Sequence, residues 1–150
     1  MQNLPHHYRV SAAVEGESAV QLTCNGLAVL ESAAPAEFGG PGDKWSPETL
    51  LVAAVADCFI LTFKAIARAS KFSWISLSCA VEGTLDTVDR LTQFTTFEVN
   101  ASLTMPPDMN EEKAMKLLMK AEQACLITNS LTADTHLTAT VQIQSEEVTS

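Results

Sequence analysis

The sequence predicts an α+β protein in which an antiparallel sheet packs against two main helices. Strand-like runs occupy the first thirty residues and the stretches 72–85, 92–104 and 137–143, and helix-like runs occupy 46–70 and 110–125. With 150 residues, of which 47% are hydrophobic and 18% charged, the chain has the size and composition of one globular domain. We therefore expect a single domain over residues 1–150, with an ordered core at about 8–144 and a frayed tail, EEVTS.

The N-terminal third predicts a hairpin followed by a long loop. Residues 8–22 alternate between apolar and polar, and Asn25-Gly26 separates them from the apolar run 27–30. Asn-Gly tolerates the positive φ angles of a tight hairpin turn, so two or three antiparallel strands are expected. The segment 32–45 is rich in Pro and Gly and predicts a loop, of a length that is often functional.

A long apolar helix is expected after this loop. Ser46 can cap it, Pro47 fits its first position, and Glu48 complements the positive end of its dipole. The helix should run to about Ser70, and its apolar residues cover nearly the whole circumference. One small domain rarely buries a helix so completely, so we expect a second copy of the chain to cover part of it.

The C-terminal half predicts two paired strands at 72–85 and 92–104, rich in β-branched and aromatic residues. Asn110 is expected to cap a second helix that ends near Cys125. A short turn or helix at 126–131 should precede the last strand.

Charge and hydropathy exclude several classes of function. A net charge of −9 and a pI near 4.6 disfavour binding to nucleic acid or to an anionic membrane surface. The longest apolar stretch, from Leu50 to Phe63, is interrupted by Asp57 and Thr62 and is interpreted as too short and too polar to span a bilayer. The start of the chain lacks the pattern of a secretory signal, so we expect a cytoplasmic protein.

The four cysteines, Cys24, Cys58, Cys79 and Cys125, lie far apart and form no CxxC pair, which favours free thiols in a reducing compartment. Cys24 and Cys79 fall inside strand patterns and Cys58 inside the apolar helix, positions typical of small core residues. Cys125 closes a helix before the polar run Thr128–Ser130, a position that apolar packing alone does not require. No His/Cys spacing matches a zinc site, so no metal is expected.

Three motifs occur in order along the chain: PAEFGG at 35–40, SPETLLVAAVADCF at 46–59 and CLITNS at 125–130. They are similar to a P-x-E-[FL]-G-G loop, a P-E-x-L-x-x-A-x-x-x-C-F helix and a C-x-x-[ST]-N segment. These belong to the OsmC/Ohr family of osmotically inducible and organic hydroperoxide resistance proteins. Together with the order of the elements, the resemblance spans about residues 8–144.

The resemblance implies an OsmC-like fold, an intertwined homodimer with active sites at the interface, and thiol peroxidase activity. It implies that Cys58 is the peroxidatic nucleophile, that Cys125 resolves its sulfenic acid as a disulfide, and that Glu48 belongs to the site. It also implies organic hydroperoxides as substrates, dithiols (including lipoyl-type ones) as reductants, and no metal or flavin. Chemistry agrees with this order of roles, because a thiolate at a helix C-terminus, as expected for Cys125, is disfavoured.

The activating cation of the family is missing from its usual place. Family enzymes set an arginine, held by the glutamate that Glu48 matches, beside the peroxidatic cysteine. Here the first strand turn reads EGES and the loop before the helix offers only Lys44, while Arg9 lies in a strand pattern. Lys44 is the better candidate, because it lies in a long loop beside the helix start. Backbone and hydroxyl donors are the alternative means of lowering the pKa of Cys58.

The role of Glu48 and the nature of the pocket also leave alternatives. Ten residues of straight helix separate Glu48 from Cys58 by about 15 Å, so Glu48 either serves a partner chain's site, acts through an intermediary, or only stabilises the helix dipole. An apolar pocket is possible from Phe38, Trp45, Leu51 and Phe59, although core packing is the ordinary role of the helix residues. Two further functions stay open: a non-enzymatic small-molecule-binding dimer with poorly activated thiols, and a structural dimer with inert core cysteines.

Overall fold

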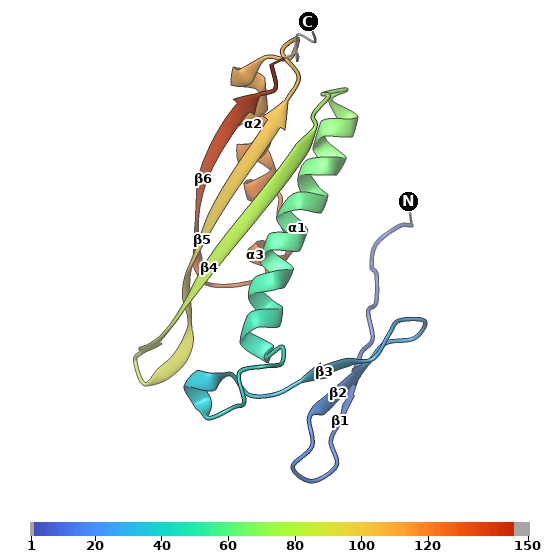
Figure 1. Ribbon diagram of the computed structural model, residues 1–150, viewed down its shortest axis with the longest axis vertical. Coiled ribbons are helices and arrows are strands. Elements are labelled where there is room, and N and C mark those ends of the chain that lie inside the picture. Colours follow the sequence, from blue (N-terminus) through green and yellow to red (C-terminus); the bar gives the residue numbers. More distant parts are fainter. Residues whose placement is uncertain (1, 146–150) are drawn as a thin grey trace, which may run out of the picture. The chain divides into compact units, whose positions relative to one another are not determined.

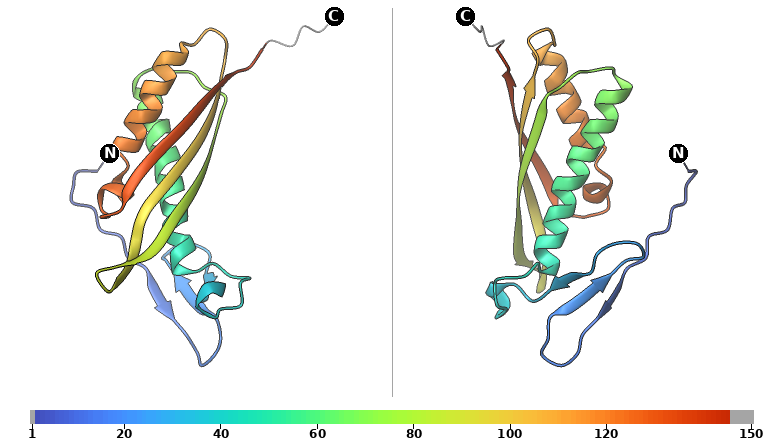
Figure 2. Two further views of the ribbon diagram at one scale, coloured as in Figure 1. Left: turned by 90° about the vertical axis from the view of Figure 1, so that its left-hand side faces the viewer. Right: turned by 45° about the vertical axis from the view of Figure 1, so that its right-hand side comes forward.

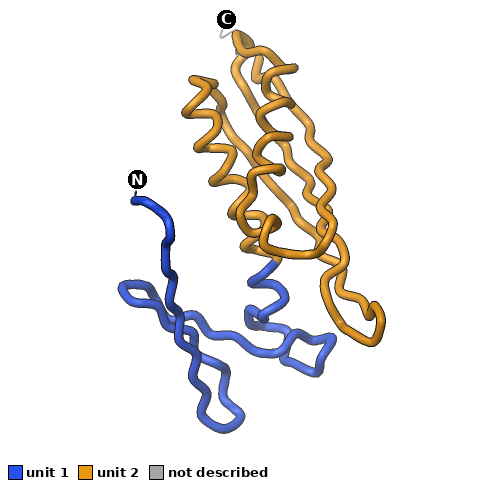
Figure 3. Tube along the Cα trace, turned by 180° about the vertical axis from the view of Figure 1, so that it is seen from behind, with its two compact units in different colours: residues 1–51 blue, residues 52–150 orange. Residues whose placement is uncertain are grey.

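The computed structural model describes residues 2–145 (Figure 1). The chain divides into two compact units, residues 1–51 and residues 52–150 (Figure 3). We call them the N-terminal and the C-terminal unit. The tail EEVTS, for which fraying was expected, lies outside the described residues. The expectation that residues 1–150 form one domain stays a prediction.

The N-terminal unit holds a small antiparallel sheet. Its strands follow one another in the order β1 (Ser11–Ala13), β2 (Val20–Thr23) and β3 (Leu30–Ser32). The predicted hairpin turn is confirmed, since the Leu27 N–H donates to the Cys24 carbonyl at 3.0 Å and Gly26 has a φ of 81°. The alternation at residues 8–10, in contrast, does not form a strand, and Arg9 is exposed there.

The predicted loop is confirmed and is more ordered than its composition suggests. It contains one turn of 3-10 helix, η1 (Ala36–Phe38), after which Gly39 adopts a φ of 84°. A side chain on Gly40 would overlap the carbonyl of Ala34. The two glycines of the PAEFGG motif are therefore demanded by backbone geometry, the first by its positive φ and the second by the close approach of the chain.

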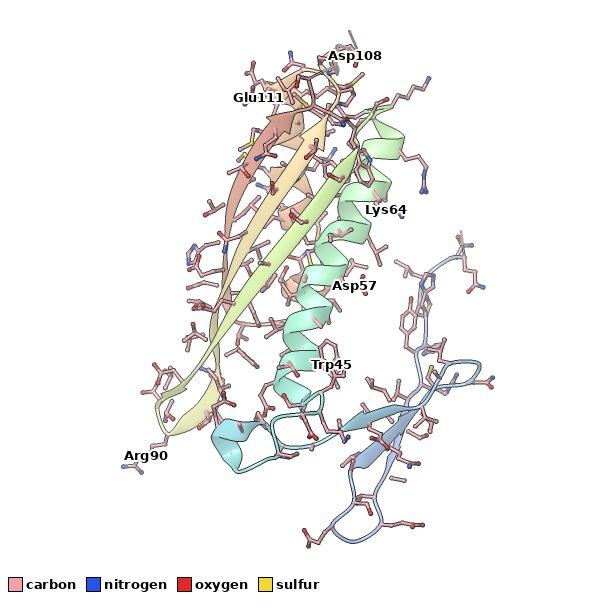
Figure 4. The ribbon with its side chains drawn as sticks, viewed as in Figure 1. Trp45, Asp57, Lys64, Arg90, Asp108 and Glu111 are labelled. Atoms are coloured by element: carbon pink, nitrogen blue, oxygen red, sulfur yellow. The ribbon has the colours of Figure 1, made fainter. Side chains whose placement is uncertain are left out.

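Helix α1 (Pro47–Ala69) begins in the N-terminal unit and continues into the C-terminal unit. Ser46 caps it as predicted, because the Thr49 N–H donates to the Ser46 Oγ at 3.1 Å. Within one chain only a stripe of the helix is buried, at every fourth position, and Leu61 is 55% exposed. Asp57 and Lys64 lie on the side of α1 turned away from β4 (Figure 4). The stripe is Val55, Phe59, Phe63 and Ala67.

Helix α1 is also long and apolar enough, by length and composition alone, to cross a membrane, and 22% of its most apolar window is buried. It is longer than the stretch from Leu50 to Phe63 on which the sequence argument against a span rested. The core helix of a soluble protein meets the same criteria, so this observation is weak evidence for a span.

The C-terminal unit is a three-stranded sheet covered on one face by helices (Figure 2). Strand β4 pairs antiparallel with β5, and β6 pairs with β5 in parallel. This corrects the expectation of a wholly antiparallel sheet: the crossover through two helices brings β6 back beside β5 in the same direction. The elements are β4 (Ser76–Val88), β5 (Leu91–Met105), α2 (Glu111–Gln123), α3 (Leu126–Asn129) and β6 (Asp134–Ile143).

The core of this unit lies between the sheet and the helices. Asn110 caps α2 as predicted, accepting from the Lys113 N–H at 3.0 Å. Alternate residues of β4 and β5 turn inward, which is the pattern of a sheet with one solvated face. The α+β fold class is thus confirmed, while the homodimer stays a prediction. The fully buried large residues of this core are Phe59, Phe63, Phe97, Leu103, Met105 and Leu118.

Candidate functional site: a thiol pair between α1 and α3

Cys58 lies in the middle of α1 and is half-buried. One turn further along the helix, the Oγ1 of Thr62 lies 3.8 Å from the Cys58 Sγ. Residues four apart share a helix face, so the position of the hydroxyl follows directly from the helical spacing. Thr62 is therefore placed to donate a hydrogen bond to a Cys58 thiolate.

Cys125 reaches the same place from the other end of the unit. It follows α2, adopts an extended conformation as the N-cap of α3, and is only 2% exposed. The chain then turns so that the backbone N–H groups of Leu126 and Ile127 and the thiol of Cys125 come close enough to the Cys58 sulfur to lower the pKa of its thiol. The structure thus brings together the two cysteines that the sequence singled out.

These donors decide the acidity of Cys58. Burial by itself raises the pKa of its thiol. The backbone N–H of Ile127, the thiol of Cys125, the hydroxyl of Thr62 and the backbone N–H of Leu126 outweigh it and hold the pKa below the ordinary value of 9.0. Cys58 is thus the more acidic member of the pair, and within residues 2–145 the groups that lower its pKa include no cation.

Cys125 has the opposite character. Burial is the largest influence and raises the pKa of its thiol. Hydrogen bonds from the backbone and the hydroxyl of Thr128 lower this pKa in part, and the neighbouring Cys58 raises it by a smaller amount. The sequence argument also expected a disfavoured Cys125 thiolate, but for a different reason. It relied on the dipole at a helix C-terminus, whereas in the structure Cys125 is buried at the start of α3. The pair therefore combines an acidic, partly accessible thiol with a buried, weakly acidic one.

The other predicted site residues lie in the N-terminal unit. Glu48 has a buried Oε2 that finds no hydrogen-bond partner among residues 2–145. Lys44 forms an ion pair with Glu31 at 3.2 Å, and this pair raises the pKa of the lysine. Arg9 is exposed. Their roles stay predictions.

The four residues of the predicted apolar pocket have different surroundings. Phe38 is 60% exposed and lines a hollow of about 360 Å³ together with Glu48. Trp45 is 48% exposed and lines a different hollow, together with Lys44. Leu51 is half-buried, and Phe59 is a core residue that is 1% exposed.

Sequence reasoning allowed for backbone and hydroxyl donors but did not identify the three that the structure supplies: the hydroxyl of Thr62 and the amides of Leu126 and Ile127. Thr62 could have been found, because it lies four residues after Cys58 in a predicted helix. The amides carry no signal in the sequence, since any residue type supplies a backbone N–H. Among residues 2–145, no group of three or more His, Cys, Asp or Glu side chains is arranged to hold a metal ion.

Comparison with known proteins places this fold among relatives. The chain is 25% identical over 136 residues to the uncharacterized protein YmaD of Bacillus subtilis, covering 88% of this chain and 91% of the relative. An OsmC-like protein of unknown function from Vibrio cholerae superimposes with a TM-score of 0.79 at 18% identity, over 89% of this chain and 100% of the other. An organic hydroperoxide resistance protein OsmC from Legionella pneumophila does so with a TM-score of 0.71 at 25% identity, over 92% and 99%.

The family described as OsmC-like protein matches residues 40–140. This range includes α1 with Cys58, the whole sheet of the C-terminal unit apart from the end of β6, and the segment that begins at Cys125. The resemblance suggested by the three motifs is thus confirmed: the chain belongs to the OsmC-like family.

Proposed function

We propose that this protein is a cysteine-based peroxidase that reduces organic hydroperoxides. The observation that carries the proposal is the set of donors around the Cys58 sulfur, two backbone N–H groups and the Thr62 hydroxyl, with the Cys125 thiol beside it. A peroxidase needs a stabilised thiolate and a second thiol nearby, and this arrangement favours the first through its donors and offers Cys125 as the second. The name of the Legionella relative, an organic hydroperoxide resistance protein, supports the choice of substrate.

In the first step the Cys58 thiolate attacks one oxygen of the hydroperoxide. The S–O bond forms as the O–O bond breaks, and the alkoxide takes a proton and leaves as an alcohol. Cys58 becomes a sulfenic acid, oxidised by two electrons.

In the second step Cys125 attacks the sulfur of the sulfenic acid. A Cys58–Cys125 disulfide forms and the hydroxyl leaves as water, taking the proton of the Cys125 thiol. The raised pKa of Cys125 suits this role, because a thiol that stays protonated does not compete for the peroxide. A dithiol reductant, for which we propose the lipoyl type, then reduces the disulfide, and such a cycle belongs in the cytoplasm.

We propose that the protein acts as a homodimer and that Glu48 completes the site. A carboxylate with a buried, unpartnered oxygen is costly unless a cation or donor satisfies it in the working assembly. Lys44 and Arg9 are the candidate cations of this chain. Lys44 would first have to leave its ion pair with Glu31.

The test is the consumption of t-butyl hydroperoxide by the purified protein with dihydrolipoamide in excess. We expect Cys58→Ser to abolish turnover, Cys125→Ser to stop it after about one equivalent, and Cys24→Ser to leave it unchanged as the matched control. If the unmodified protein consumes peroxide no faster than buffer with reductant, the proposal is wrong.

The non-enzymatic alternative is favoured by a different observation, the hollow in the N-terminal unit. Glu48, whose Oε2 has no hydrogen-bond partner among residues 2–145, and the aromatic residue Phe38 both line this hollow. An anionic oxygen beside an aromatic ring suits an organic cation. Binding of benzamidinium that Glu48→Gln weakens at least tenfold, in a protein without peroxide turnover, would favour this function.

A further inference from the structure

Asn129 belongs to the CLITNS motif, but the proposed function does not use it. It is the last residue of α3, as Gln123 is the last residue of α2. The side-chain Nδ2 of Asn129 donates to the Gln123 carbonyl oxygen at 3.2 Å. The carbonyl groups in the last turn of a helix find no partner within the helix, so this side chain satisfies one of them. Asn129 therefore joins the end of α2 to the end of α3.

Asn129 is also bonded to the link between the two helices. This link consists of Ala124 and Cys125, and Cys125 adopts an extended conformation with φ −65° and ψ 114°. The backbone N–H of Asn129 donates to the Cys125 carbonyl at 3.0 Å. Asn129 thus holds the chain on one side of Cys125 through its side chain and at Cys125 itself through its backbone. Rotation of the Cys125 backbone would have to break or stretch one of these two hydrogen bonds.

Helix α3 needs such bonds to keep its direction. It has four residues, and a helix this short has little stability of its own. In Figure 1 and in both views of Figure 2, α3 lies beside the middle of α1, the part of that helix that contains Cys58. A change in the angle between α2 and α3 would consequently move Cys125 relative to α1.

We infer that Asn129 is a positioning residue for the second step, in which Cys125 attacks the sulfenic acid on Cys58. The inference rests on the proposed function, which supplies this step. The Cys58–Cys125 bond forms, the S–O bond of the sulfenic acid breaks, and the hydroxyl leaves as water with the proton of the Cys125 thiol. The Asn129 side chain exchanges no proton or electron in this step. It restricts Cys125 to the orientation from which the attack occurs, and a small misplacement of a reacting group slows a reaction strongly.

Loss of the Asn129 side-chain bond should therefore slow the second step more than the first. The nucleophile of the first step and its hydroxyl donor, Cys58 and Thr62, both lie on α1 and do not depend on the link. For the second step we expect a slowing of about three- to tenfold, the range that the net contribution of one hydrogen bond gives.

The test is the competition between Cys125 and dimedone for the sulfenic acid. The reduced protein receives one equivalent of t-butyl hydroperoxide and excess dimedone at pH 7, and mass spectrometry of its tryptic peptides gives the ratio of Cys58 adduct to Cys58–Cys125 disulfide. This ratio does not depend on the rate of the first step. It should rise about three- to tenfold in Asn129→Ala and in Asn129→Asp, which is nearly isosteric but places an acceptor where the amide donates.

Two controls separate positioning from a general loosening of the fold. Ser130→Ala also removes one hydrogen bond from this segment, since the Ser130 hydroxyl donates to the Leu126 carbonyl at 2.8 Å, but it leaves the link untouched. It should keep the ratio of the unmodified protein. In a Cys125→Ser background, Asn129→Ala should leave the rate of the dimedone reaction unchanged, which shows that the access of dimedone to Cys58 is the same.

A ratio that stays unchanged in both Asn129 variants, or that rises equally in Ser130→Ala, overturns the inference and leaves the peroxidase intact. A faster dimedone reaction in the Cys125→Ser background that accounts for the whole rise overturns it as well. If Cys58 gains neither adduct nor disulfide in the unmodified protein, the proposed function fails and the inference fails with it.

Discussion

The Thr62 hydroxyl lies 3.8 Å from the Cys58 sulfur, one turn along the same helix. It is the one side-chain hydroxyl among the groups that lower the pKa of this thiol in the described part of the chain. A hydroxyl at this place donates a charge-assisted hydrogen bond to the thiolate, which is stronger than the hydrogen bond that it can share with the neutral thiol.

Thr62→Val should therefore raise the pKa of Cys58 and slow its reaction with peroxide at pH 7 by about three- to tenfold, or roughly 0.7–1.4 kcal/mol. The change is nearly isosteric, and Thr62→Ser, which keeps the hydroxyl, is the matched control. The rate of iodoacetamide labelling of Cys58 between pH 5 and 9 measures the effect. Identical profiles for the Val and Ser variants would show that the hydroxyl plays no part.

Lys44→Met should change the rate of iodoacetamide labelling of Cys58 by less than about twofold at any pH between 5 and 9. The groups that lower the pKa of Cys58 all belong to its own unit, and Lys44 is already paired with Glu31. Exposed ion pairs contribute about 0–1 kcal/mol, so the variant should fold normally. A slowing of tenfold or more would assign Lys44 the activating role that the sequence suggested.

Leu61→Glu should weaken or abolish the proposed homodimer. Leu61 is 55% exposed in the single chain, on a helix of which only one stripe is buried. A partner chain that covers this part of the helix would bury the side chain at position 61, and an unpaired carboxylate there would be costly. Sedimentation at low micromolar concentration should show a dimer for the unmodified protein and for Leu91→Glu, a control with a similarly exposed leucine at a hairpin end. A folded monomer without any substitution would contradict the prediction.

Stability should fall as the pH rises from 9 to 11, and Cys79→Ala should reduce this loss. Burial raises the pKa of Cys79 from 9.0 to about 11, so in this window the folded chain holds a proton that the unfolded chain has released. The contribution of the protonated Cys79 thiol to the free energy of unfolding is complete below pH 9 and is lost as the pH rises through 11. It amounts to about 1 kcal/mol after allowance for partial exposure of the thiol. Urea unfolding at pH 8 and pH 10.5 measures it, and equal losses in both proteins would contradict it.

Much of the fold could be predicted because its signals are local. The Asn25-Gly26 turn, the caps Ser46 and Asn110 and the long helix between them depend on residues close in sequence, and all are found. The direction of β6 could not be predicted in this way. It depends on how the chain crosses back after α2, which no periodicity within the strand encodes.

The site was predictable where chemistry resides in side chains. Cys58 and Cys125 were identified through motifs, and the structure brings them together. The donors that replace a cation are mostly backbone amides, which only the turn after Cys125 places beside the sulfur. Cys79 was interpreted as a core residue because it lies inside a strand pattern, and the structure places it half-buried on the inner face of β4.

The central claim is that Cys58 attacks hydroperoxide and Cys125 resolves it, and Cys125→Ser isolates the first half of that claim. Without the resolving thiol, the sulfenic acid on Cys58 should persist long enough to be trapped. The measurement is mass spectrometry of the tryptic peptides after one equivalent of cumene hydroperoxide in the presence of dimedone. The account predicts that the dimedone adduct forms on Cys58, within seconds and in nearly full yield. A Cys58 peptide that gains neither oxygen nor adduct, while the peroxide remains unconsumed, would contradict it.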